Sequence, residues 1–355
     1  MGMRSRHTWI IAAAGLALGA LGVLLSVWGN PENSGICISC FIENSAGALG
    51  LHDNARLQYL RPELPGFVLG ALISALVAGE FRPRGGSAPI HRLFSGIFLI
   101  VGCAIFIGCP IKLLLRLSAG DLTAVAGFAG LGAGVWTGIR VSASGVDLGG
   151  QERERSINGL LIPGVFLLLL LFSLFHPPFI LASTEGSSAR HAPLFTSLGS
   201  GLFLGVLAQR SRFCITGSMR DILLLGRRAP QIIGFALLIA AAVSISLASG
   251  RFHLSLYGQP GSHLEHLWSF LGMGLVGWIS VLIGGCPFRQ LIKAGEGDAD
   301  AGLSVAGMFL GGALVESWGI TATAAGVPLN GKMALLAGFA FVLLTSLLFR
   351  ERSVR

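Results

Sequence analysis

Long apolar runs recur along this chain of 355 residues and are separated by short polar or basic loops. The first run extends from about Trp9 to Trp28, and a later one covers about 157 to 182. A helix needs roughly 20 such residues to cross a hydrocarbon core of about 30 Å. Hydrophobic residues make up 53% of the chain and charged residues 12%, whereas a soluble domain has about 25% charged residues. The sequence therefore predicts an all-α integral membrane protein.

A motif built on Gly-Cys-Pro occurs twice, once around Cys109 and once around Cys286. The two copies are 177 residues apart (286 minus 109) and align without a gap. Their shared positions are Gly108, Cys109, Pro110, Lys112, Arg116, Gly120 and Asp121 in the first copy and Gly285, Cys286, Pro287, Arg289, Lys293, Gly297 and Asp298 in the second. The same offset carries Cys37 onto Cys214, since 214 minus 37 is also 177. We therefore expect two homologous halves, residues 1–182 and 183–355, that form one membrane domain.

Five apolar spans fit into each half. Those of the first half cover about 8–29, 65–80, 93–109, 121–140 and 157–182, and those of the second cover about 193–209, 230–249, 267–285, 300–320 and 332–349. Four further pieces, at about 37–50, 111–118, 214–226 and 288–294, are too short to cross and are expected to be re-entrant or broken helices around a central path. Because five is odd, the second half must enter the membrane inverted relative to the first. Inverted repeats are typical of transporters.

The charges of the loops agree with this inversion. Lys and Arg gather in the N-terminal tail, the loops 80–92 and 140–156, the segment 210–228 and the tail after Phe349, whereas the loops 183–192, 250–266 and 321–330 carry few. By the positive-inside rule, both termini are cytoplasmic. The same pattern explains the net charge of +8, and the scattered cations do not indicate nucleic-acid binding. No cleavage site follows the first run, so we expect it to be a membrane helix and not a signal peptide.

Four motif cysteines, Cys37, Cys109, Cys214 and Cys286, are the candidate substrate-path residues. In the duplicated Gly-Cys-Pro motif, the proline ends the long helix at the cysteine and is well suited to start a short one. The free backbone N–H groups at the start of a helix attract anions. A cysteine can also be a small buried hydrophobe, and we expect that role for Cys103. The proline, the cations and the duplicated register favour a functional role for the other four.

Basic residues accompany the cysteine motifs and would attract an anion. They are Lys112, Arg116, Arg289, Lys293 and Arg212. Two of them follow each Gly-Cys-Pro four residues apart, which places them on one face of the short helix. Asp121 and Asp298 occupy matching positions, where they would either cap the next helix or form an ion pair that orients Arg116 or Lys293.

Two other chemistries fit single features of the chain. Cys37-x-x-Cys40 has the spacing of a redox pair, but Gly217 stands where Cys40 would recur in the second half. Cysteines together with His52 could bind a soft metal, although the cations around every motif disfavour a metal site. We find no nucleotide-binding motif, and so expect neither direct use of ATP nor a cofactor.

Four short motifs carry a resemblance to a known family. They are Gly-Ile-Cys-Ile-Ser-Cys-Phe at 35–41, Gly-Cys-Pro at 108–110, Arg-Phe-Cys-Ile-Thr-Gly at 212–217 and Gly-Gly-Cys-Pro at 284–287. With these motifs the chain resembles the YeeE/YedE family of sulfur-transport membrane proteins, and its segment 61–63, its Gly-Gly-Ser-Ala-Pro loop and its segment 116–121 look like the selenium-associated YedE branch of selenium transporters. The resemblance implies that Cys37, Cys109 and Cys286 line a narrow central path, with Cys214 as the counterpart of Cys37.

We therefore expect an inner-membrane permease, and not an enzyme, for a small sulfur- or selenium-containing anion such as thiosulfate. Besides the lipid bilayer, a cytosolic sulfur-carrier or selenium-metabolism protein is the partner that would suit such a permease. The alternative is a membrane-embedded thiol-disulfide or sulfur-transfer oxidoreductase that uses Cys37 and Cys40. A soft-metal channel is the third hypothesis.

Overall fold

Helices make up most of residues 2–350, which are the residues that the computed structural model describes. The α-helices are α1 (Gly2–Val27), α2 (Ile38–Ala48), α3 (Glu63–Val77), α4 (Pro89–Phe106), α5 (Pro110–Ser118), α6 (Ala124–Ala143), α7 (Ser156–Phe175), α8 (Leu194–Ser211), α9 (Ile215–Leu225), α10 (Gln231–Ala248), α11 (His266–Leu282), α12 (Pro287–Gly295), α13 (Ala299–Ser317) and α14 (Leu329–Leu348). A 3-10 helix, η1 (Gly226–Arg228), and two short strands, β1 (Arg84–Gly85) and β2 (Glu152–Arg153), complete the described elements. The predicted all-α class is confirmed. The tail beyond residue 350, which the loop charges place on the basic side, lies outside the described residues.

Eight helical segments in the described chain are long and apolar enough to cross a membrane. Two of them join a long helix to the short helix that follows it, α4 to α5 and α11 to α12, and the others are α1, α6, α7, α10, α13 and α14. These segments confirm a multi-pass membrane protein. The ten expected spans also include α3, which has only 15 residues, and α8, which has 18 residues but several Ser and Gly in place of apolar side chains. For α3 and α8 the crossing stays a prediction.

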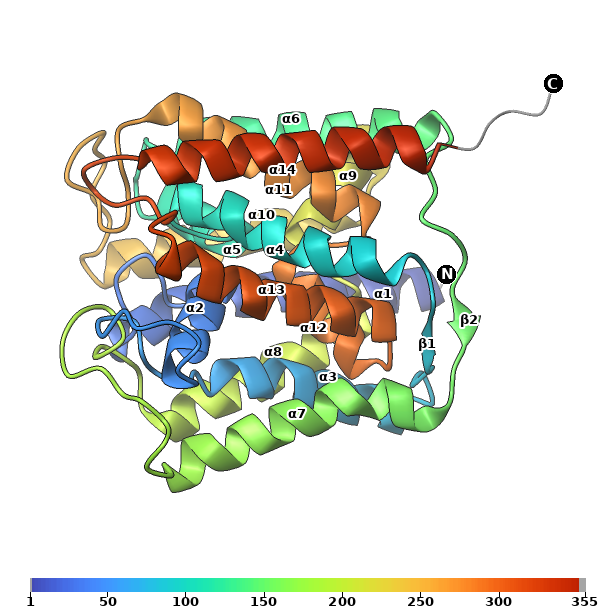
Figure 1. Ribbon diagram of the computed structural model, residues 1–355, viewed down its shortest axis with the longest axis horizontal. Helices are drawn as coiled ribbons and strands as arrows, with labels where there is room; N and C mark the ends of the chain where they lie inside the picture. Colours follow the sequence, from blue (N-terminus) through green and yellow to red (C-terminus); the bar gives the residue numbers. More distant parts are fainter. Residues whose placement is uncertain (1, 351–355) are drawn as a thin grey trace.

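The long helices lie roughly parallel, and both ends of the described chain lie at the same end of the bundle (Figure 1). The strands β1 and β2 are at this end, which we call the terminal end, and pair antiparallel with Arg84 opposite Arg153. Loops that follow α1, α2, α7, α10 and α13 form the opposite end. Sites at the two ends are therefore separated by the length of the long helices.

Close helix pairs hold the bundle together. α1 packs against α10, α3 against α8, α4 against α13 and α6 against α11. Glycines bring α6 and α11 very close together. A Cβ atom added at Gly134 would overlap the carbonyl oxygen of Gly274. Small residues let membrane helices approach in this way, because lipid supplies no hydrophobic force that would press the helices together.

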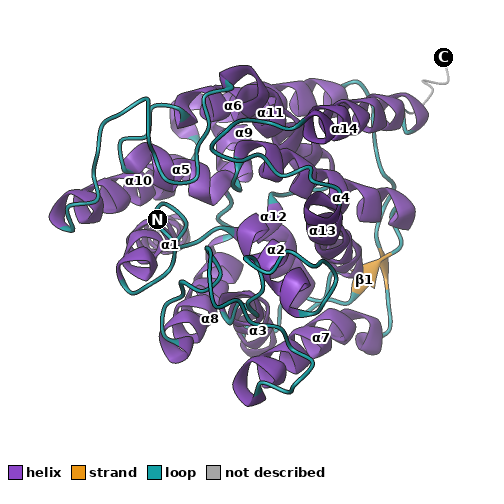
Figure 2. Cartoon of the chain, turned by 60° about the vertical axis from the view of Figure 1, so that its left-hand side comes forward, coloured by secondary structure: helices purple, strands orange, loops and turns teal. Residues whose placement is uncertain are grey.

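The short helices α2, α5 and α12 lie inside this bundle, and nearly all their residues are buried. Figure 2 shows α2 and α12 near the middle, with long helices around them. By contrast, α7 and α14 lie at the outside of the bundle and expose leucines such as Leu161, Leu168, Leu344 and Leu347. Exposed apolar faces of this extent indicate contact with lipid. The fold therefore places the short helices, with their charged and polar side chains, in a core that lipid does not reach.

Each Gly-Cys-Pro motif interrupts a long helix. α4 and α11 stop shortly before Pro110 and Pro287, which are the first residues of α5 and α12. The turn between them requires left-handed backbone, with φ of 60° at Ile107 and 80° at Gly284, which are equivalent positions under the 177-residue offset. Glycine adopts this conformation freely, whereas a β-branched isoleucine is strained there. The strain lies two residues before Cys109, and strained backbone clusters at functional sites.

Candidate functional site

Each of the four short helices begins directly after a motif cysteine. Cys37, Cys109, Cys214 and Cys286 are the N-cap residues of α2, α5, α9 and α12, and all four have extended backbone. An N-cap side chain lies beside the N–H groups of the first helical turn, which have no partner within the helix. These groups and the helix dipole favour negative charge. The structure therefore puts each predicted path cysteine next to a helix end that attracts anions.

The four cysteines are buried and lie in two pairs. The Sγ atoms of Cys214 and Cys286 are 3.3 Å apart. In the other pair the backbone N–H of Ile38, the residue after Cys37, donates a hydrogen bond of 3.2 Å to Sγ of Cys109. Cys109 also lies within electrostatic reach of Cys286. Each half of the chain thus contributes one pair, and the pairs approach one another inside the bundle.

Cys37 and Cys40 form a disulfide, with their Cα atoms 5.3 Å apart. Cys40 is the member of the pair that has no counterpart in the second half. Oxidised Cys37 has no thiol hydrogen, so it accepts hydrogen bonds, as from the backbone N–H of Cys40 at 3.4 Å, but donates none. A role for Cys37 as a thiol donor therefore requires reduction of the disulfide. Cys103, expected to be a core residue, is a free and buried cysteine in α4.

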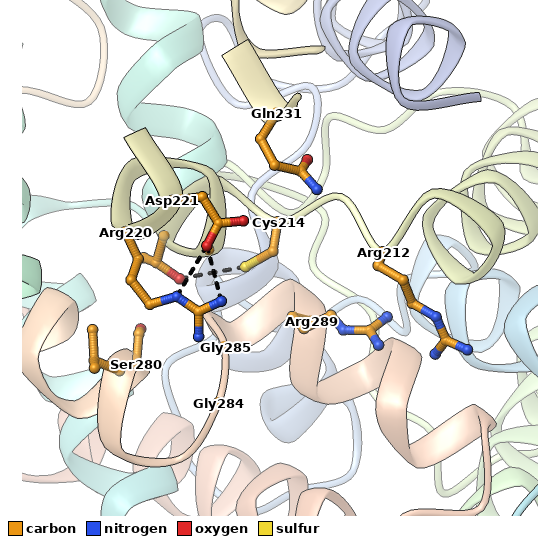
Figure 3. Close-up of a pocket in the computed structure, with 12 residues that line it drawn as sticks. Arg212, Cys214, Arg220, Asp221, Gln231, Ser280, Gly284, Gly285 and Arg289 are labelled. Atoms are coloured by element: carbon orange, nitrogen blue, oxygen red, sulfur yellow. Dashed lines mark hydrogen bonds and ion pairs between the residues drawn. The ribbon is translucent and has the colours of Figure 1, made fainter. Parts of the chain in front are cut away.

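A cavity of about 210 Å³, which we call the Cys214 cavity, is lined by residues that follow the last residues of α8 and α11, toward the terminal end. Figure 3 shows the side chains that line it. Its lining includes Arg212, Cys214, Arg220, Gly284, Gly285 and Arg289. In Figure 3, Arg220 lies beside Asp221, and the two form an ion pair of 2.9 Å. Since a water molecule takes about 30 Å³ in the liquid, the cavity has room for a small oxyanion with some of its water. Cations, one cysteine of the Cys214–Cys286 pair and a glycine turn thus meet at one small cavity.

Acidic partners hold the other two arginines of the Cys214 cavity. Buried Glu296 lies 3.1 Å from Arg289 and 2.6 Å from Arg212. Arg212 also contacts Glu80 at 2.8 Å. A hydrogen bond from Gln209 and the charge of Arg212 hold the pKa of Glu80 below its usual value, although burial opposes this. The guanidinium groups of Arg212 and Arg289 are therefore held in place as hydrogen-bond donors, and their charges are largely neutralised by the two acids.

A second cavity, of about 340 Å³, lies toward the opposite end, and we call it the Lys112 cavity. Its lining includes Cys40, Glu43, Asn44, Arg61, Lys112 and Arg190. Arg61 is buried and donates hydrogen bonds to Asn44 at 2.9 Å and to Asn30 at 3.1 Å. Lys112 is only 3% exposed. Within the described chain, no hydrogen bond or ion pair engages its ammonium group, so it is free to bind an anion.

Arg116, one helical turn beyond Lys112, is bound quite differently. Its Nε atom lies 2.7 Å from Oδ2 of Asp121, and its Nη1 atom donates to the carbonyl of Phe106 at 3.0 Å. Both members of the ion pair are buried. Arg116 is thus neutralised, and it ties α5 to the end of α4 and the start of α6.

The second copy of the motif contains the equivalent ion pair. Nζ of Lys293 lies 3.3 Å from Oδ2 of Asp298. Asp298 also caps α13 by accepting a hydrogen bond of 2.9 Å from the backbone N–H of Ala301. The two roles considered for this aspartate are therefore both present. Of the five cations expected to attract an anion, Lys112 is the one without an acid within 4 Å in the described residues.

Several cavity residues were not expected from the sequence, notably Glu43 and Arg61 in the Lys112 cavity and Arg220 in the Cys214 cavity. A signal for two of them exists, because 220 minus 43 is again 177. Each therefore lies six residues after the N-cap cysteine of its short helix. The repeat thus marks both as charged residues of a short helix, with opposite sign in the two halves.

The comparison with known proteins gives one short match. Over 104 residues the chain is 31% identical to the thiosulfate transporter TsuA of Escherichia coli (strain K12). The match spans 29% of this chain and 29% of that transporter. No protein-family model matches the chain. The chain is therefore similar over part of its length to a thiosulfate transporter, and this similarity supports a sulfur-anion transporter in general.

Proposed function

We propose that this chain is an inner-membrane permease for a small sulfur- or selenium-containing anion of the thiosulfate type. One observation carries the proposal: two cation-lined cavities lie toward opposite ends of the bundle, and each has a motif cysteine in or next to its lining, Cys214 in one and Cys37, bonded to Cys40, in the other. The partial similarity to a thiosulfate transporter supports the same substrate class. The cations of the two cavities can bind an anion, and moving an anion needs no catalytic group. The proposed role is therefore transport and not catalysis.

The proposed path runs between two inverted halves, residues 1–182 and 183–355. Under this scheme α1, α3, α4 and α6 correspond to α8, α10, α11 and α13. The pairing of α1 with α10 then corresponds to that of α8 with α3, and α4 with α13 to α11 with α6. This exchange of partners between the halves supports the inverted repeat, because a two-fold axis between the halves would produce it.

A small oxyanion that leaves water must regain hydrogen bonds along this path. Lys112 would replace water at one end, and the arginines of the Cys214 cavity at the other. Between them, the N-terminal N–H groups of four short helices supply donors, and thiols such as those of Cys109 and Cys286 supply weak S–H donors with a polarizable sulfur. Such contacts are brief enough to let the anion move on.

The proposed orientation places both termini in the cytoplasm, since the basic loops lie at the terminal end. The Cys214 cavity then faces the cytoplasm and the Lys112 cavity faces outside. A cytosolic sulfur-carrier or selenium-metabolism protein would meet the substrate at the Cys214 cavity. The proposal includes selenium anions because the segments 61–63 and 116–121 and the Gly-Gly-Ser-Ala-Pro loop look like the selenium-associated branch.

Uptake measurements test the permease. Cells that lack their own thiosulfate uptake, supplied with the wild-type chain, should accumulate radiolabelled thiosulfate or selenite, and the preferred label identifies the substrate. Cys109→Ala and Cys286→Ala should each abolish uptake at normal protein levels in the membrane. Cys103→Ala is the matched control, because Cys103 is equally buried but belongs to no motif pair. Normal uptake by both motif variants would refute the cysteine path.

The disulfide favours a second candidate function, a thiol-disulfide or sulfur-transfer oxidoreductase. Cys40 lines the Lys112 cavity and is only partly buried, so a small thiol could reach it. This candidate requires Cys40 for turnover, whereas the permease does not, since the repeat lacks a second Cys40.

A further inference from the structure

The carboxylate of Glu43 is unusual among the buried acids of the described chain. The other buried acids all have partners: Glu63 accepts from Asn30, Asp121 pairs with Arg116, Glu296 with Arg289, Asp298 with Lys293, and Asp300 accepts from Ser87. The Glu43 carboxylate has neither a hydrogen bond nor an ion pair in residues 2–350, although the residue is only 7% exposed. An ionised carboxylate buried in this way is costly unless a cation or a proton compensates it. A functional reason for keeping an acid there is therefore needed.

Glu43 and Lys112 line the same cavity from different helices, α2 and α5. They are more than 4 Å apart, since no ion pair joins them, so a space separates the two charges. Without a bound anion, Lys112 is the cation that compensates the charge of an ionised Glu43 across the cavity. An anion bound at Lys112 neutralises the positive charge of the ammonium group, so this charge no longer stabilises the Glu43 carboxylate. The anion also repels the carboxylate directly. Protonation of Glu43 removes the repulsion and turns the carboxyl into a hydrogen-bond donor.

We propose that Glu43 takes up a proton when an anion binds beside Lys112, so that anion transport is coupled to protons. The inference rests on the proposed function for the identity of the anion. The proton comes from water on the Lys112 side and adds to the carboxylate, and no bond other than this O–H forms or breaks. When the anion has moved on toward the Cys214 cavity, the proton returns to water on that side, and Lys112 again faces an ionised Glu43.

The charged groups around Glu43 limit what else could titrate. Glu316 of α13 is bound by Asn54 and Thr321, at 2.7 and 2.6 Å. His52 is held by a hydrogen bond of 2.9 Å to the backbone oxygen of Glu43. The remaining groups that face the cavity or the Glu43 side chain are Lys112, Arg61, Arg190, Glu32 and the thiol of Cys103. Arginine stays charged at any working pH, so a pH effect that does not come from Glu43 would have to come from Lys112, Glu32, Glu316, His52 or Cys103.

Binding of thiosulfate to the purified full-length protein in detergent tests the coupling. Thiosulfate does not titrate near neutral pH, so any pH dependence belongs to the protein. If one proton accompanies the anion, affinity for thiosulfate falls about tenfold for each pH unit on the alkaline side of the transition. Glu43→Gln, which keeps the size of the side chain, should bind thiosulfate with no pH slope in this range. Lys112→Arg should keep the slope, because the titrating group is still present.

Glu32→Gln is the matched control, since Glu32 lines the same cavity but is 54% exposed and pairs with Arg251. It should keep the wild-type slope. In proteoliposomes, an inward proton gradient should accelerate thiosulfate uptake by the wild type and by Glu32→Gln, but not by Glu43→Gln. A wild type that binds thiosulfate without a pH slope, or a Glu43→Gln variant that keeps it, overturns the coupling. A wild type that neither binds nor transports thiosulfate or selenite refutes the proposed function itself.

Discussion

The backbone N–H of Ile38 donates a hydrogen bond to Sγ of Cys109, and the two atoms are 3.2 Å apart. The bond joins the start of α2 to the start of α5, two segments that are 71 residues apart in sequence. Cys109 therefore has a structural role in addition to the proposed role in the path. Substitutions can separate the two.

Cys109→Ala removes the acceptor and leaves a small void, and should lower the free energy of unfolding by about 1–2 kcal/mol. Cys109→Ser keeps an acceptor for Ile38, and should be close to the wild type in stability. Both variants lose the sulfur, so both should lose uptake of thiosulfate. Thermal unfolding in detergent and uptake in cells measure the two effects. Normal uptake by Cys109→Ser would show that the path needs a hydrogen-bond donor at this position and not sulfur.

Lys112 and Arg116 lie one turn apart on α5, and their removal should have opposite consequences. Arg116→Met leaves buried Asp121 without its ion-pair partner, and loss of one partner of such a pair costs about 3–5 kcal/mol. Lys112→Met removes a buried charge that has no acid within 4 Å, and Glu43, which it faces across the cavity, can become neutral by taking up a proton. Stability should therefore stay the same or rise.

Uptake completes this comparison. Lys112→Met should abolish anion uptake in a well-folded protein, whereas Arg116→Met should lower the amount of protein in the membrane. Thermal unfolding of both purified variants, together with uptake per molecule in the membrane, measures the difference. Strong destabilisation by Lys112→Met would mean that Lys112 has a structural partner and is not free for an anion.

Local chemistry explains what could be predicted from the sequence. Each predicted span overlaps one helix, and a new helix begins at Pro110 and at Pro287, as proline favours. Helix ends were less accurate, as at Ile107, where left-handed backbone ends α4 before the expected residue 109. Such a turn depends on the surrounding packing, because the isolated isoleucine disfavours it.

Long-range packing explains what could not be predicted. Glu43 is a polar residue on a short helix in the sequence, and it is buried because α13 approaches α2 closely at Gly312. Lys112 and Arg116 are indistinguishable in the sequence, since both are basic residues of one helix face. In the fold, Arg116 is neutralised because Asp121 lies beside it. Lys112 instead faces Glu43 across a cavity and stays free.

Gly134 tests the packing of the long helices. A Cβ atom at this position would overlap the carbonyl oxygen of Gly274, so Gly134→Ala should force α6 away from α11 and cost about 1–3 kcal/mol. Gly164→Ala in α7 is the control, because nothing lies within 4 Å of the added atom. It should leave stability unchanged or raise it, since alanine favours helix. Thermal unfolding of both variants in one detergent measures the difference. Equal stability of the two would contradict the close contact.

Cys40→Ser distinguishes a permease from an oxidoreductase that uses the Cys37–Cys40 disulfide. The substitution leaves Cys37 as a free N-cap thiol of α2, so a permease should keep its uptake. Cys37→Ser is the matched variant, because it breaks the same disulfide but also removes the sulfur next to Cys109. It should lose uptake while Cys40→Ser does not. Uptake of radiolabelled thiosulfate at equal protein levels measures both. If the two variants lose uptake equally, the disulfide pair itself is required, and the oxidoreductase becomes the better explanation, since only that chemistry needs both sulfur atoms.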